Sequence, residues 1–186
     1  MPDNDQVAAA VRQWVETVVV GLNLCPFARR ELDKDRARFV VSDAITEQGL
    51  LVDLEAELEL LEKDASIATT LLIHPRVLEA FYEYNQFLNY AEGLLQQMEL
   101  EGVYQIASFH PDYQFDGTES DDAENYTNRS PYPVLHLLRE ESLDRVLESA
   151  DYAEQIPIRN IKLLNTMGRT ELSALLKACL DIVKPD

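Results

Sequence analysis

The segments Thr70-Leu71-Leu72-Ile73-His74-Pro75 and Gln105-Ile106-Ala107-Ser108-Phe109-His110-Pro111 have the same form, an apolar run that ends at a His-Pro pair. Each run has the length of a buried β-strand, and residues 76–98 between them have the apolar spacing of a helix. A strand, a helix and a second strand of this length form a βαβ unit, in which the strands lie parallel. We therefore expect His74 and His110 at one edge of a sheet, the carboxyl edge, where open α/β folds place their sites.

The flanking sequence extends this unit on both sides. Residues 38–42 are typical of an earlier strand, and residues 46–63 have the leucine spacing of an acidic amphipathic helix. Residues 133–139 fit either a fourth strand or the opening of a helix, and we favour the strand. We predict an α/β (or α+β) fold with a three- to four-stranded, mainly parallel sheet built from βαβ units and packed with helices.

Additional helices are expected at both ends of the chain. Asn4 or Asp5 can cap a first helix that runs to about Gly21. Pro26 suits the first position of a short helix, which would place Cys25 at its N-cap. We predict a single α/β domain over residues 1–186, with a C-terminal helical appendage from about 141 to 186. Its helices are expected at 143–154, 159–166 and 170–183, with breaks at Pro157 and Gly168.

The composition restricts the classes of partner. The chain has 186 residues, of which 46% are hydrophobic, and a formal net charge of −18. Such a surface repels phosphate backbones and anionic lipids, so we expect neither a nucleic-acid nor a membrane partner. Two cysteines are too few for a secreted disulfide scaffold, and the acidic N-terminus does not have the form of a secretory signal. We therefore expect a cytoplasmic protein, whose oligomeric state the sequence does not indicate.

Several motifs resemble those of an uncharacterised bacterial family, domain of unknown function 1415. The similarity extends from the first helix to about Ala150, and it implies a bacterial, soluble, cytoplasmic protein. The family has no established activity, so the resemblance assigns no catalytic residue. The motifs are Asn23-Leu24-Cys25-Pro26-Phe27-Ala28, Phe109-His110-Pro111-Asp112-Tyr113-Gln114-Phe115, Asn125-Tyr126-Thr127-Asn128-Arg129-Ser130-Pro131-Tyr132-Pro133 and His136-Leu137-Leu138-Arg139-Glu140.

Cys25 is a candidate nucleophile. A thiol at a helix N-terminus, near Arg29 and Arg30, can have a lowered pKa. His110 or His136 would supply the base of a Cys-His pair. The alternative for Cys25 is a small buried hydrophobic residue, which is also how we interpret the second cysteine in the final helix.

The loop at residues 111–133 contains a candidate anion site. Arg129 could bind a carboxylate or phosphate through both guanidinium nitrogens, with Asn128, Ser130 and Arg139 assisting. The alternative is an ordered loop in which Arg129 pairs with Asp121 or Asp122.

A metal is a further alternative. His110, His136, Asp112 and Asp122 carry the nitrogen and oxygen ligands that a divalent metal such as zinc accepts. No pair has a specific spacing such as that of a His-Glu-x-x-His motif, and the histidines could instead cap strand ends by hydrogen bonding.

These candidates support three hypotheses for the function. The first is a small-molecule hydrolase or transferase in which Cys25, His110 and His136 act on a substrate held by Arg129, with or without a metal. The second is a non-catalytic module that binds a small anionic metabolite through the Arg129 loop. The third is an acidic interaction domain that uses the helix at 46–63. The enzyme hypothesis requires that Cys25, His110, His136 and Arg129 converge.

Overall fold

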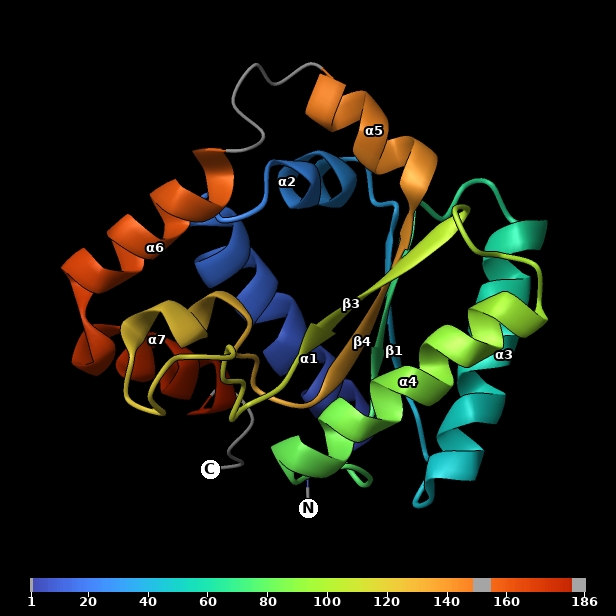
Figure 1. Cartoon of the computed structure of the whole chain (residues 1–186), viewed down its shortest axis with the longest axis horizontal. Helices are drawn as coiled ribbons and strands as arrows, with labels where there is room; N and C mark the ends of the chain where they lie inside the picture. Colours follow the sequence, from blue (N-terminus) through green and yellow to red (C-terminus); the bar gives the residue numbers. More distant parts are fainter. Residues whose placement is uncertain (1, 149–154, 182–186) are drawn as a thin grey trace.

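A four-stranded sheet separates two layers of helices in the computed structural model of the chain, which describes residues 2–148 and 155–181 (Figure 1). Helices α3 and α4 cover one face of the sheet, and α1, α2, α6 and α7 lie on the other side. The fold is therefore α/β, as the sequence predicted. The helices are α1 (Asn4–Trp14), the π-helix η1 (Val15–Val20), α2 (Pro26–Asp33), α3 (Glu47–Lys63), α4 (Phe81–Gln97), the 3₁₀ helix η2 (Ala123–Thr127), α5 (Glu140–Glu148), α6 (Gln155–Met167) and α7 (Arg169–Asp181).

The sheet is mixed, with the strand order β1-β2-β4-β3. The strands are β1 (Ala37–Val41), β2 (Thr69–Ile73), β3 (Tyr104–Phe109) and β4 (Val134–Arg139). β1 and β2 are parallel, whereas β4 is antiparallel to both β2 and β3. The expectation of a mainly parallel sheet was wrong, because β4 enters between the two strands of the predicted βαβ unit. Both neighbours run opposite to β4, so β2 and β3 still point the same way and share a carboxyl edge.

Residues 134–139 form a strand, as we favoured, and their side chains alternate between the two faces of the sheet. Leu135 and Leu137 pack with the leucines of α3 and with α4. Val134 packs on the other face, in the cluster that contains α1. His136 shares the face of Val134, opposite Leu71 on β2. This alternation decides which residues reach the cavity described below.

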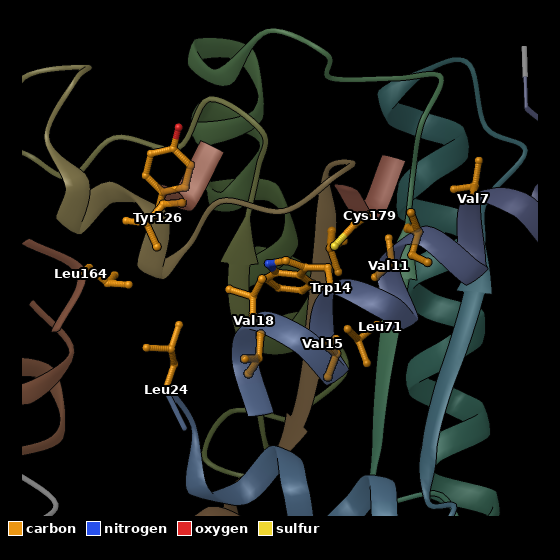
Figure 2. Packing of buried hydrophobic residues seen from close by; sticks show 14 of the residues in the cluster. Val7, Val11, Trp14, Val15, Val18, Leu24, Leu71, Tyr126, Leu164 and Cys179 are labelled. Atoms are coloured by element: carbon orange, nitrogen blue, oxygen red, sulfur yellow. The ribbon is translucent and has the colours of Figure 1, made fainter. Parts of the chain in front are cut away.

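The N-cap of the first helix precedes both residues that the sequence suggested, Asn4 and Asp5. Asp3 is the N-cap: its carboxylate accepts the N–H of Gln6, whose side chain accepts the N–H of Asp3. Val7, Val11 and Trp14 then line one side of α1 and belong to the apolar cluster that includes Leu71 of the sheet, with Val11 and Trp14 near Leu71 (Figure 2). After Trp14 the backbone continues as the π-helix η1 to Val20, so that a single helical rod covers this face.

The C-terminal helices pack on the same apolar cluster through Leu164 of α6 and through Leu172 and Cys179 of α7. Gly168, at φ +82°, separates the two helices as predicted. The predicted break at Pro157 was wrong. Pro157 lies in the first turn of α6, where an N–H has no partner within the helix.

The helix expected at 143–154 begins at Glu140, and its last six positions lie outside the described residues. Within residues 2–148 and 155–181, no helix combines the length and apolar character that a bilayer crossing requires.

Candidate functional site

A small cavity of about 50 Å³ lies between α1, η1 and α2 on one side and the sheet on the other. It is smaller than a typical small-molecule site of about 300–1,000 Å³, so a ligand of more than a few atoms would enter it with one end only. Most of the lining is apolar: Trp14, Val15, Val19, Phe27, Ala28, Leu32, Ala37, Phe39, Leu71 and Phe109. Four polar or ionisable residues complete the wall, namely Cys25, Glu31, Thr69 and His136. The structure therefore brings Cys25 and His136, two of the predicted site residues, to one hollow.

One hydrogen bond determines which ring nitrogen of His136 carries the proton. Its Nε2 lies 2.7 Å from Thr69 Oγ1, and that hydroxyl donates to the carbonyl oxygen of Leu137 at 2.6 Å. Because the hydroxyl has only one proton, Nε2 must donate to it. Burial lowers the pKa of His136 to about 4, so the imidazole is neutral at pH 7. The ring remains partly exposed although β4 is an interior strand, because it opens onto the cavity.

Cys25 is the N-cap residue of α2, as predicted, with extended backbone at φ −133° and Pro26 in the first helical turn. Burial raises the pKa of its thiol, and the N–H groups of Ala28 and Phe27 offset this only in part. This direction is opposite to the one that a catalytic thiol requires, and it fits the alternative of a small buried hydrophobic residue. The neighbouring arginines are engaged elsewhere: Arg29 donates to a carbonyl oxygen of η1, and Arg30 lies 3.8 Å from a carboxylate oxygen of α2.

Two buried polar atoms without hydrogen-bond partners belong to residues that line this cavity, Nε1 of Trp14 and Oε2 of Glu31. Glu31 is only 4% exposed. Its oxygens lie 3.7 Å from Arg36 and 3.8 Å from Arg30, which compensates the charge at distances too long for hydrogen bonds. Buried polar groups are normally satisfied. Trp14 and Glu31 therefore each carry an unsatisfied polar atom that is sealed behind the apolar wall of the cavity.

His110 is at the carboxyl edge of the sheet, as predicted, but does not line the cavity. Its Nε2 donates to the carbonyl oxygen of Leu78 at 3.2 Å, and its Nδ1 accepts the N–H of Asp112 at 3.0 Å. The ring packs between Phe81 and Tyr84, at centroid distances of 5.4 and 5.1 Å. This is the strand-capping role that we weighed against catalysis.

His74 ends β2 beside this cluster. Its Nδ1 donates to the carbonyl oxygen of Val77 at 3.0 Å, whereas its buried Nε2 has no hydrogen-bond partner among the described residues. Tyr84 stacks on the ring at 5.7 Å. The Tyr84 hydroxyl donates to the carbonyl oxygen of Val134 at 2.8 Å and accepts the N–H of Phe109 at 3.0 Å. The two His-Pro strand ends are thus fastened to α4 and the following loops.

Arg129 fastens the long loop to itself. Its Nε donates to the carbonyl oxygen of Tyr113 at 3.1 Å, and a terminal nitrogen donates to that of Ser120 at 2.8 Å. The guanidinium also lies 4.7 Å from the ring centre of Tyr126. An arginine held in this way is not free to clamp an anion. The alternative, in which Arg129 orders the loop, describes this residue better. Its acceptors are carbonyl oxygens and not the predicted Asp121 or Asp122, and Asp121 pairs with Arg169.

The other proposed anion ligands also bond to the backbone. Asn128 donates to the carbonyl oxygen of Ser108 at 2.9 Å, and the buried Ser130 hydroxyl donates to that of Tyr132 at 2.6 Å. Arg139 joins the end of β4 to α3, to the loop that follows α3 and to β3. It donates to the carbonyl oxygens of Leu61, Asp64 and Ile67 and to the hydroxyl of Tyr104. None of these three residues lines the cavity.

The predicted metal candidates are dispersed. His136 faces the cavity, His110 and Asp112 lie at the sheet edge, and Asp122 accepts the N–H of Glu119 within the loop. In the part of the chain that the structure describes, no three His, Cys, Asp or Glu side chains are grouped so that they could hold a metal ion.

Three cavity residues, Trp14, Glu31 and Thr69, were not among our candidates. Glu31 lies four positions after Phe27, on the same face of a short helix, which is a signal for its burial. Thr69 precedes Leu71 by two positions, so both side chains lie on one face of β2.

The DUF1415 family, described as a protein of unknown function, matches residues 6–174. The chain belongs to the DUF1415 family. The match confirms the resemblance drawn from the motifs, and every residue that lines the cavity falls within it. Comparison of this DUF1415 protein with curated proteins and with solved structures gave no match.

Proposed function

We propose that this DUF1415 protein binds a small, predominantly apolar molecule in the cavity between α1, α2 and the sheet. The observation that carries the proposal is the lining, in which ten of the fourteen residues are apolar. Protein interiors are packed as densely as organic crystals, so an unfilled hollow of this kind forfeits contacts that a ligand would restore. His136, whose ring borders the cavity, supplies a polar group that could orient such a ligand.

A thiol-dependent hydrolase or transferase is the second candidate, because Cys25 and His136 share this cavity. Transfer of a proton from the thiol to the imidazole would begin such a reaction. The pKa of Cys25 is raised and that of His136 is lowered to about 4, and both shifts oppose the transfer. The geometry therefore supports binding more strongly than thiolate chemistry.

The proposal can be tested with N-phenyl-1-naphthylamine, an apolar dye whose fluorescence increases when water is excluded. We expect a saturable increase with the wild-type protein. Ala28→Leu and, independently, Ala37→Leu place three additional carbon atoms on the cavity wall and should each weaken binding about ten-fold or more. Ala56→Leu is the matched control, since Ala56 is exposed on α3 beyond the opposite face of the sheet.

Thermal unfolding of each variant would verify that the fold is retained. The proposal fails if the wild-type protein shows no saturable binding. It also fails if both folded cavity-filling variants bind the dye as tightly as the Ala56→Leu control.

A further inference from the structure

The hydrogen bonds around His136 leave one ring nitrogen as an unused acceptor. Thr69 donates its only hydroxyl proton to the carbonyl oxygen of Leu137 at 2.6 Å. The 2.7 Å hydrogen bond between Thr69 Oγ1 and His136 Nε2 must therefore use a proton on Nε2. A neutral imidazole carries one N–H and one lone pair. The lone pair of His136 is therefore on Nδ1, in a tautomer that the protein itself fixes.

Nδ1 has no hydrogen-bond partner among residues 2–148 and 155–181. Unlike Nε1 of Trp14 and Oε2 of Glu31, it is not completely buried. The surroundings of the ring are apolar: Leu71 and Ala107 are its cross-strand neighbours, and the ring of Phe109 is 6.1 Å away. An acceptor in such a wall interacts strongly with a donor, because little water competes for it.

We propose that His136 determines the specificity of the cavity by accepting, at Nδ1, a hydrogen bond from the hydroxyl group of a neutral alcohol or phenol with an apolar body. This inference rests on the proposed binding function and specifies its ligand class. A carbonyl or ether oxygen has no proton to donate to Nδ1. An ionised ligand would lose its hydration in this apolar lining without a charged partner to replace it.

Calorimetric titration with naphthalene, 2-methoxynaphthalene and 2-naphthol, which share one ring system, distinguishes apolar binding in the cavity from recognition of a hydroxyl group by His136. Binding of naphthalene tests the apolar cavity alone. We expect 2-naphthol to bind about five-fold more tightly than 2-methoxynaphthalene, the effect of one net hydrogen bond.

His136→Leu should abolish this preference and retain naphthalene binding. His136→Asn should keep the preference, because its Oδ1 can occupy the position of Nδ1. In the wild-type protein, the ¹⁵N resonance of His136 Nδ1 should shift on addition of 2-naphthol and not on addition of 2-methoxynaphthalene, a result that needs no variant to fold.

The inference is overturned if the wild-type protein binds 2-naphthol and 2-methoxynaphthalene equally. It is also overturned if the preference survives in His136→Leu, or if it disappears only in Glu31→Gln, which would assign the acceptor to Glu31. Naphthalene binding without discrimination would leave the apolar-site proposal standing, whereas failure of all three compounds to bind would remove both.

Discussion

Acid should destabilise this protein through His74. Its ring is fully buried, its Nδ1 donates to a carbonyl oxygen, and its Nε2 has no acceptor within reach. Protonation would therefore place a charge and an unsatisfied N–H in the core. Burial lowers the pKa of His74 from 6.5 to about 4, a larger effect than the opposing bond to Val77.

The sign of the pH dependence follows from linkage. Between pH 6.5 and about 4 the unfolded chain binds a proton at His74 that the folded protein does not. The contribution of neutral His74 to the free energy of unfolding is fully present above pH 6.5 and is lost as the pH falls from 6.5 to about 4. At 1.36 kcal/mol per pKa unit, the loss at pH 5 is about 2 kcal/mol for this histidine.

Urea denaturation at pH 7 and pH 5 measures this term. The comparison uses the wild-type protein and His74→Asn, whose amide can still donate to Val77 but does not titrate in this range. The many surface carboxylates contribute equally to both proteins and cancel. We expect the wild-type protein to lose about 2 kcal/mol more than the variant between the two pH values. Equal losses would refute the claim that His74 is held neutral by burial.

Three further outcomes are expected. Tyr84→Phe should lower the free energy of unfolding in urea by about 2 kcal/mol, because the backbone groups of Val134 and Phe109 lose their partner. Tyr90→Phe on the same helix is the control, and it should be neutral because the Tyr90 side chain is 61% exposed. Arg129→Ala should destabilise the protein by about 1–3 kcal/mol and leave dye binding unchanged, because Arg129 orders the loop and does not line the cavity. Iodoacetamide at pH 8 should alkylate Cys25 more slowly than a free cysteine, and naphthalene should slow it further. Peptide mass spectrometry separates this modification from that of Cys179, and a rate above that of free cysteine would favour thiolate catalysis.

The strands could be predicted from the sequence because each one is a local apolar run. The apolar run at 69–73 is β2, and that at 103–109 contains β3. The shared edge of His74 and His110 followed from the direction of those strands. The insertion of β4 did not follow, because pairing partners depend on contacts between distant segments. One signal was available: Val134–Arg139 is apolar on both of its faces, which is typical of an interior strand.

The site was predicted only in part. The position of Cys25 at a helix start depends on the adjacent proline, a local rule, and it was correct. The convergence of Cys25 with His110 and Arg129 was not. The ring of His110 turns toward a carbonyl oxygen of the loop after β2, and Arg129 finds its acceptors on the backbone of its own loop. Residue type indicated chemical capacity, but long-range packing determined which groups were already satisfied.

The chain contains a single tryptophan, Trp14, whose indole N–H gives one resonance in a ¹H–¹⁵N spectrum. This residue lines the cavity, and its Nε1 has no hydrogen-bond partner in the part of the chain that the structure describes. Titration with naphthalene should shift that resonance to a saturating limit while the amides of the exposed face of α3 remain unchanged. A ligand that moves the α3 amides and leaves the Trp14 indole in place would contradict binding in the cavity.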